Sequence, residues 1–296
     1  MVKKRHIPSE VIELSYQAPP GTPAGVEVMS LAELRTRAPE GLLPRPQRLD
    51  FHQLLAVDSG AATHTVDFTG YWLTEGSLLW VRPGQVQQFG EVAAMEGTVL
   101  LFQPGFLPPG NTVAALADDP FGPVLHQPAG TDRTAVFQAV RHLAAEFAAT
   151  GLPAEAHTEI LRHLLSVLLL RLAHPGTPAG SSVPAPGDAF LRFRAAVERD
   201  FATSHRVADY ARRLGYSPRT LSRATLAAAG VGAKEFLDRR VMLEAKRLLA
   251  HSDLPAVRIG ERLGFADAAN FAKFFQLRAG VSPGAFRDSL GSGGAQ

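Results

Sequence analysis

Two short stretches in the C-terminal third of the chain carry polar side chains of the kind that hydrogen-bond to DNA. Arginine can bind two acceptors on guanine, and asparagine can bind one donor and one acceptor on adenine. Arg219 in the first stretch and Asn270 in the second are therefore candidates for base contacts; the alternative is that they touch phosphate or only solvent. The full set of expected DNA-binding residues is Ser217, Arg219, Thr220, Ser222, Arg223, Ala268, Asn270, Lys273 and Arg278.

The elements that must position these side chains form an internal repeat. A leucine, a glycine and an aromatic residue at 214–216 recur at 263–265, an offset of 49. Further along, Leu221 corresponds to Phe271, an offset of 50. Apolar positions are kept while polar positions change, which is expected of one supersecondary unit used twice against two different surfaces.

Each copy has the parts of a helix-turn-helix. Gly215 and Gly264 permit the positive φ that a tight turn between two helices needs. Ser217 with Pro218 in the first copy, and Asp267 in the second, are favourable residues at the start of the following helix. The other helices of this domain are expected at residues 190–201, 207–214, 234–250 and 256–263, the third of them joining the two units.

A longer motif runs through the second copy. It consists of Leu263, Gly264, Phe265, Asp267, Phe271, Lys273, Phe275, Gly280, Ser282, Pro283, Phe286 and Arg287. This motif resembles that of the DNA-binding domain of the AraC/XylS family of bacterial transcription regulators. The resemblance implies a sequence-specific regulator whose two helix-turn-helix units are joined by a long helix. Two residues depart from the family pattern: Thr225 stands where an apolar residue is usual, and Ala269 where a small hydroxyl residue is common.

Charge is distributed unevenly along the chain. The net charge is only +2, yet residues 188–296 carry 18 Lys and Arg against 11 Asp and Glu, and the rest carries 12 against 17. A basic C-terminal part is the electrostatic signature of a nucleic-acid module joined to a different domain. The chain has no cysteine, which excludes disulfides, thiol catalysis and cysteine metal sites. No apolar run is long enough to span a bilayer, so we expect a cytoplasmic protein with no membrane partner.

A short helix is expected at residues 28–37. The stretch at residues 49–104 then changes to short apolar runs separated by glycine-containing turns. This pattern favours a small antiparallel barrel or sandwich. It resembles the cupin-type effector domain of the same regulators, whose two motifs are similar to His64 with Asp67 and to residues 82–87 here. The fold class is therefore expected to be α+β with two domains: a cupin-like barrel with a helical hairpin, followed by an all-α domain.

A metal-binding cupin needs several histidines and a carboxylate that converge inside the barrel. Only His52 and His64 are present in this region, so we expect no metal, no cofactor and no catalytic residue. A pocket for an unknown small-molecule effector remains, because small barrels can hold one ligand. The candidates to line it are His52, His64, Trp72, Trp80 and Gln87; alternatively, the two tryptophans are core or dimer contacts.

Two helices are expected after the barrel, at residues 132–150 and 153–174, and their apolar character suits a homodimer interface. They could equally pack on their own barrel. The expected domains are a flexible arm at 1–26, the effector and dimerisation domain at 27–173, a linker at 174–187, the DNA-binding domain at 188–290 and a disordered tail at 291–296.

These features predict a DNA-binding transcription regulator controlled by a small-molecule effector, not an enzyme. Its expected partners are double-stranded DNA, the effector, a second copy of the chain and RNA polymerase. Two alternatives stay open: a constitutive DNA-binding regulator whose barrel only dimerises, and a cupin metalloenzyme fused to a DNA-binding domain.

Overall fold

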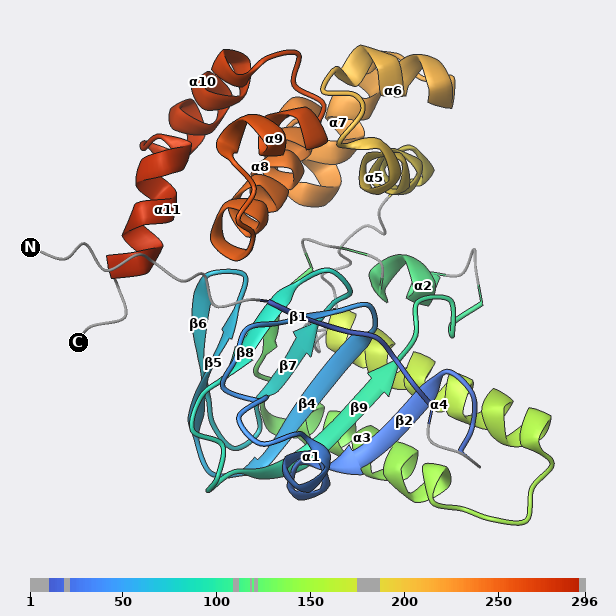
Figure 1. Ribbon diagram of the computed structural model, residues 1–296. Helices are drawn as coiled ribbons and strands as arrows, with labels where there is room; N and C mark the ends of the chain where they lie inside the picture. The colour runs from blue at the N-terminus through green and yellow to red at the C-terminus, as the bar shows by residue number, and fades with distance from the viewer. Residues whose placement is uncertain are drawn as a thin grey trace, which may run out of the picture. The chain divides into compact units, whose positions relative to one another are not determined.

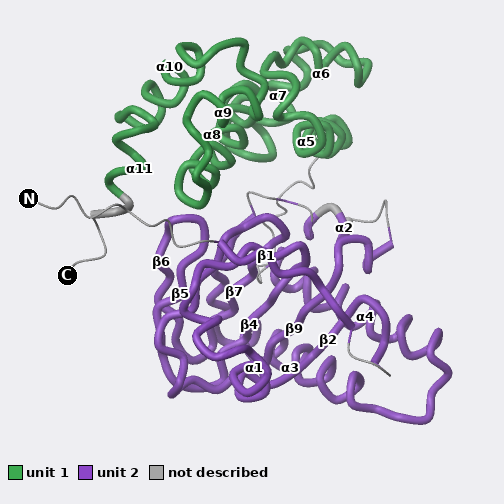
Figure 2. The backbone as a smooth tube through the Cα atoms, viewed as in Figure 1, with its two compact units in different colours: residues 1–10, 183–296 green, residues 11–182 purple. Residues whose placement is uncertain are grey.

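The computed structural model describes residues 11–18, 22–108, 112–117, 119, 122–174 and 187–292. These residues form two compact units, one ending at His174 and the other beginning at Gly187 (Figure 2). Most of the expected linker and the tail beyond residue 292 lie outside the described residues, as do residues 1–10 of the expected arm. Within the described residues, no helix is long and apolar enough to cross a membrane.

The N-terminal unit contains two five-stranded sheets (Figure 1). The first has the order β1 (Ile12–Leu14), β3 (Gln47–Leu49), β8 (Val86–Phe89), β5 (Ala62–Val66) and β6 (Thr69–Leu73). The second has the order β10 (Leu125–His126), β7 (Leu78–Val81), β4 (His52–Ser59), β9 (Glu96–Phe102) and β2 (Val26–Ser30). All pairings are antiparallel except β1 with β3. No hydrogen-bonded pair links the two sheets among the described strands, so the expected barrel is an open one.

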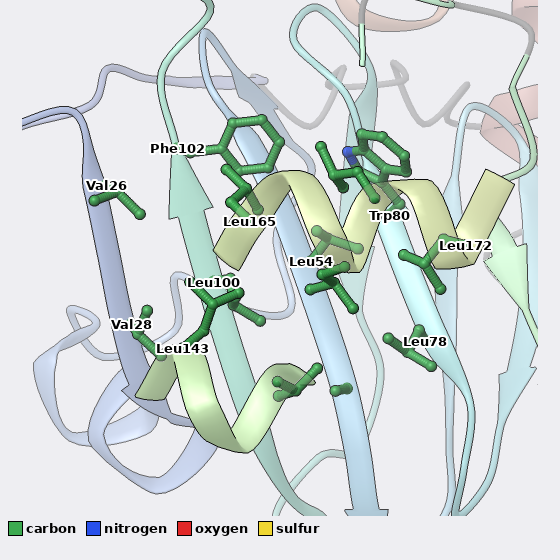
Figure 3. Packing of buried hydrophobic residues seen from close by; sticks show 14 of the residues in the cluster. Val26, Val28, Leu54, Leu78, Trp80, Leu100, Phe102, Leu143, Leu165 and Leu172 are labelled. Carbon is green, nitrogen blue, oxygen red and sulfur yellow. The ribbon is translucent and has the colours of Figure 1, made fainter. Parts of the chain in front are cut away.

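The second sheet is buried on both faces. Leu55 and Val57 of β4 pack between the two sheets, whereas Leu54 and Ala56 face outward. On that outer face the strand side chains pack against α3 (Gly130–Phe147) and α4 (Ala154–Ala173), as Figure 3 shows. The two helices are the expected hairpin, and their apolar stripes cover the sheet of their own chain.

Two segments near the start of this unit differ from the sequence-based expectation. No packed element was expected before residue 27, yet β1 pairs with β3 and Val26 begins β2. Residues 28–37 were expected as one short helix, but the segment divides at Ser30 into β2 and α1 (Leu31–Arg37). Ser30 and Glu33 form a capping box there, which fixes the start of the helix. Helix α2 (Thr112–Ala117) completes the unit.

The C-terminal unit consists of helices in the described residues, and the expected order of helices is confirmed up to residue 279. The helix at residues 283–292 was not expected, and it includes the first two residues of the expected tail. The helices are α5 (Asp188–Asp200), α6 (Val207–Leu214), α7 (Pro218–Ala229), α8 (Ala233–His251), α9 (Ala256–Arg262), α10 (Ala268–Ala279) and α11 (Pro283–Ser292). Helices α6 and α7 form the first helix-turn-helix, α9 and α10 form the second, and α8 connects them.

Candidate DNA-binding and ligand-binding sites

Helices α7 and α10 are structural copies of each other. Residues 218–230 and 268–280 show the same succession of buried, intermediate and exposed positions, at the offset of 50 seen in the sequence. Ser217 caps α7 by accepting a hydrogen bond from the Thr220 amide at 3.0 Å, and Asp267 caps α10 by accepting from the Asn270 amide at 2.7 Å. Both helices end at a glycine in the left-handed conformation. The first turn of each helix therefore exposes the corresponding residues to solvent.

The polar residues expected at a DNA surface stand mostly on the exposed sides of these two helices. Arg219, Thr220 and Arg223 are exposed on α7, and so are Ala268, Asn270 and Lys273 on α10, while Ser222 is partly buried. Within the described part of the chain, neither Arg219, Arg223 nor Lys273 forms an ion pair. Their charges are available for phosphates or for base edges in a major groove.

Asn270 and Arg278 each have a partner within the unit. The side-chain amide of Asn270 donates to Asp267 Oδ2 at 2.8 Å, which restricts its rotamer. Arg278 donates to the buried Asp238 of α8, and its guanidinium lies 4.0 Å from the centre of the Phe274 ring. The structure thus gives Arg278 a role in joining α10 to α8, and a DNA contact by this residue stays a prediction.

Thr225, which departs from the family pattern, is fully buried. Its hydroxyl donates to the Leu221 carbonyl at 2.7 Å, so the polar group is satisfied inside the helix. Ala269, the other departure, is exposed at the start of α10. Neither residue disturbs the helix in which it lies.

We expect Arg219→Ala and Asn270→Ala to weaken specific DNA binding by about 1–3 kcal/mol each and to relax the preference at one base position, because a bidentate base contact is lost. Affinities for a selected operator and for single-base variants of it would measure this. Arg192→Ala on α5 removes a charge of the same kind outside the two recognition helices and should leave base preference unchanged. Equal weakening on every sequence would show phosphate contacts instead.

In the N-terminal unit, a buried polar cluster lies between the two sheets. Gln87 Oε1 accepts from Gln53 Nε2 at 2.9 Å and lies 3.1 Å from His64 Nε2. The Gln87 amide nitrogen is 3.2 Å from Gln53 Oε1 and 3.5 Å from Gln47 Oε1. All four side chains are buried. Burial lowers the pKa of His64 to about 4, so this imidazole is neutral at pH 7.

The five residues expected to line one effector pocket do not share one cavity. His64 and Gln87 lie between the sheets, whereas His52 and Trp80 pack on the outer face of the second sheet, where their rings meet Phe102. Trp72 lies on β6 with 61% of its surface exposed. Burial and the charge of Arg82 lower the pKa of His52 to about 3.

A cavity of about 390 Å³ adjoins the polar cluster. Gln47 and Gln53 contribute amides to its wall, and Tyr16, Glu27 and Arg37 also line it. The expected set did not include these five residues. One signal was available for Gln53, because an amide inside the apolar run of β4 is a buried polar group that needs a partner. Among the described residues, no three His, Asp or Glu side chains come together as metal ligands.

Comparisons with known proteins identify both domains. Residues 210–289 match the model described as a helix-turn-helix domain, and residues 34–173 match the AraC-like ligand binding domain. The HTH-type transcriptional activator RhaS of Klebsiella pneumoniae (strain 342) is 26% identical over 260 residues, which cover 86% of this chain and 91% of the relative. RhaS of Citrobacter koseri is 27% identical over 259 residues, covering 84% and 89% of the two chains.

Among solved structures, the crystal structure of ToxT from Vibrio cholerae O395 aligns over 91% of this chain and 97% of its own, with a TM-score of 0.41 and 15% identity. The two domain models and the relatives define a DNA-binding transcription regulator that carries a ligand-binding domain. The chain belongs to the AraC family.

Proposed function

We propose that the protein is an effector-responsive, sequence-specific transcription activator that works in the cytoplasm as a homodimer and has no enzymatic activity. The observation that carries the proposal is the pair of capped, exposed recognition helices in one unit and a polar-lined cavity in the other. The relatives named above are transcriptional activators, which supports activation and a contact with RNA polymerase.

We place the effector in the cavity beside Gln47 and Gln53. Amide groups both donate and accept hydrogen bonds, and the neutral His64 stands behind them, so these walls suit an uncharged, hydrogen-bonding molecule. Tyr16, just beyond β1, and Arg37 of α1 line the cavity as well. An effector bound in this cavity can therefore change how firmly these two segments hold to the sheets. Effector control requires that the effector bind the two arrangements of these segments with different affinities.

The test of this function is selection of bound sequences from a random duplex pool by the full-length protein. A regulator should enrich one motif and bind it roughly a thousandfold more tightly than a scrambled control. Binding should be compared at two salt concentrations, because phosphate contacts alone give strong but sequence-blind affinity. With the operator known, a metabolite screen for altered operator affinity separates effector control from the constitutive alternative.

For the homodimer we infer an interface on α4. Ile160, Val167 and Leu170 are apolar and more than a third exposed, although the opposite side of the same helix packs on the sheet. Their spacings of seven and three residues put them on one stripe, the pattern of helices that pair along a seam. A second copy of α4 would cover this stripe.

Val167→Glu should convert the dimer to monomer, because it places a charge in the centre of the stripe. Sedimentation velocity over a range of concentrations would show a dissociation constant raised by roughly a hundredfold, corresponding to about 2.7 kcal/mol. Leu152→Glu, an exposed apolar residue before α4, is the matched control and should not change association. Unaltered dimerisation of Val167→Glu would place the interface elsewhere.

A further inference from the structure

Helix α8 carries the two helix-turn-helix units on neighbouring segments of its length. Its buried apolar residues between 233 and 241 belong to the hydrophobic cluster that includes Leu221 of α7. Its buried apolar residues between 242 and 249 belong to the cluster that includes Phe271 and Phe275 of α10. A directional contact between one segment and the helix packed on the other would fix how α10 is placed relative to α7.

Asp238 of α8 makes such a contact. It lies within the segment that carries α7, yet its Oδ2 accepts a hydrogen bond from Arg278 Nη2 in the last turn of α10. Its Oδ1 accepts a hydrogen bond from Lys234 Nζ, one turn earlier on α8. Only 4% of the Asp238 side chain is exposed. A charged carboxylate that is buried needs partners, and this one draws one of them from the second helix-turn-helix.

The guanidinium of Arg278 is held in place by its own helix as well. Its Nη1 donates to the Phe274 carbonyl at 3.2 Å, and its central carbon lies 4.0 Å from the centre of the Phe274 ring. Phe274 in turn packs against the hydrophobic clusters of both helix-turn-helix units. Because a planar guanidinium bonds in fixed directions, the ion pair restricts both the distance and the rotation of α10 relative to α8.

An alanine stands at the position that corresponds to Arg278 in the first repeat. This residue, Ala228, is exposed near the end of α7, at the offset of 50 that relates the two helices. Both helices show the same succession of buried and exposed positions, so a recognition helix of this kind does not itself require an arginine here. The arginine is particular to α10, the helix whose placement relative to α7 the ion pair restricts.

We propose that Asp238 is a positioning residue that sets the operator spacing the protein accepts. By holding Arg278, it fixes the distance and rotation between α7 and α10, which enter two successive major grooves. One base pair inserted between the two boxes shifts them by about 3.4 Å and turns them by about 35°. Firmly held helices cannot follow this change, whereas loosened helices can. The inference rests on the proposed function, since it requires that both recognition helices bind one operator.

Operators of altered spacing test this inference. The operator selected by the full-length protein is the parent, and one or two base pairs are inserted between the two boxes that one chain binds. The wild-type protein should lose roughly a hundredfold in affinity on the altered operators, because only one helix-turn-helix can then bind at a time. Asp238→Asn keeps the shape of the side chain and removes its charge. It should bind the parent roughly tenfold more weakly and lose no more than about tenfold on the altered operators.

Two further variants separate positioning from folding and from DNA contact. Arg278→Gln removes the other member of the pair and should flatten the dependence on spacing in the same way as Asp238→Asn. Lys234→Gln is the matched control, because it also removes a partner of Asp238 but one on the same helix, and it should keep the wild-type dependence. Duplexes that carry a single box should be bound equally by all four proteins, since each helix-turn-helix stays folded.

The proposal is overturned if Asp238→Asn depends on spacing as steeply as the wild-type protein, or if Lys234→Gln is flattened as well. Equal weakening on every duplex, single boxes included, also overturns it, because loss of stability or of a phosphate contact acts in that way. Failure to select any operator with two boxes overturns the proposed function and this inference together. A two-box operator with an unchanged dependence on spacing overturns this inference alone.

Discussion

A Gly264→Ala variant should unfold its C-terminal unit far more readily than the wild-type protein, while the equivalent Gly215→Ala variant should lose much less stability. Both glycines close the turn of a helix-turn-helix, with φ of +79° and +73°. An alanine in this left-handed region costs about 1–2 kcal/mol at either position. The two positions differ in their surroundings, and for this reason we expect the two variants to lose different amounts of stability.

Gly264 is pressed against another part of the unit. A Cβ atom there would lie 2.1 Å from the carbonyl oxygen of Ala202, in the loop between α5 and α6. At Gly215 no heavy atom of the described residues, apart from the glycine itself and its two chain neighbours, lies within 4 Å of the same position. The close approach is to backbone, which cannot rotate away, so the loop must move and its packing is lost. Overpacking of this kind costs about 1–3 kcal/mol in addition to the conformational term.

The loop packed on Gly264 is a second junction between the two helix-turn-helix units. The ring centre of His205 in this loop lies 4.5 Å from that of Phe265. Phe201 packs against the hydrophobic clusters of both helix-turn-helix units. Helix α8 is the first junction, with Asp238 bound to Arg278 of α10. Weakening the second junction should therefore also loosen the relative placement of α7 and α10, on which simultaneous binding to two grooves depends.

The measurement for the glycine pair is urea unfolding of the full-length protein, followed by far-UV circular dichroism and by tryptophan fluorescence. Both tryptophans lie in the N-terminal unit, so fluorescence reports on that unit alone. The helical signal of Gly264→Ala should be lost at lower urea, with the fluorescence transition unchanged. Equal effects of the two substitutions would mean that the contact with Ala202 does not contribute to stability.

The DNA-binding unit could be predicted closely from the sequence because its information is local. Ser217, Asp267 and the glycines at 215 and 264 act on the residues beside them, and a repeat at fixed spacing checks each assignment against a copy. The partner of Arg278 could not be predicted in this way. Asp238 lies 40 residues earlier, and only the packing of α10 on α8 brings the two side chains together.

The fold class of the N-terminal unit could be predicted from the sequence, but the face of the sheet on which each side chain lies could not. His52 and Gln53 are neighbours on β4, yet one packs under the helices and the other lines the space between the sheets. Alternation along a strand places them on opposite faces, but both faces of this strand are buried, so the sequence pattern does not tell which face is inside. Trp72 and Trp80 are separated because they lie in different sheets, Trp72 exposed on the edge strand β6 and Trp80 buried on β7.

Acidification below pH 6.5 should destabilise the N-terminal unit progressively. His52, His64 and His126 have pKa values of about 3, 4 and 4 in the folded protein, all below the ordinary value of 6.5. As pH falls from 6.5, the unfolded chain takes up protons that the folded unit cannot bind. Stability that is fully present above pH 6.5 is therefore lost as pH approaches 4. Asp58 opposes this, since burial raises its pKa.

By pH 4.5, two units below the ordinary imidazole pKa, each imidazole contributes a loss of up to about 2.7 kcal/mol, because one pKa unit corresponds to about 1.4 kcal/mol, and the three together contribute up to about 8 kcal/mol. That is a large part of the stability of an ordinary domain. The urea midpoint of the fluorescence transition at pH 7, 6, 5 and 4.5 would measure this loss of stability. These pH values extend from above the ordinary imidazole pKa to well below it.

A His52→Phe variant provides the matched control for this pH dependence. His52 stacks on Phe102 with ring centres 4.3 Å apart and planes 11° apart, so phenylalanine keeps the ring contact and removes the titrating group. It gives up the hydrogen bond from Trp80 Nε1, which measures 3.4 Å. We expect lower stability at pH 7 but a shallower decline toward pH 4.5. An equally steep decline in the variant would show that protonation of His52 is not among the causes, and a flat profile in the wild-type protein would contradict the depressed pKa values themselves.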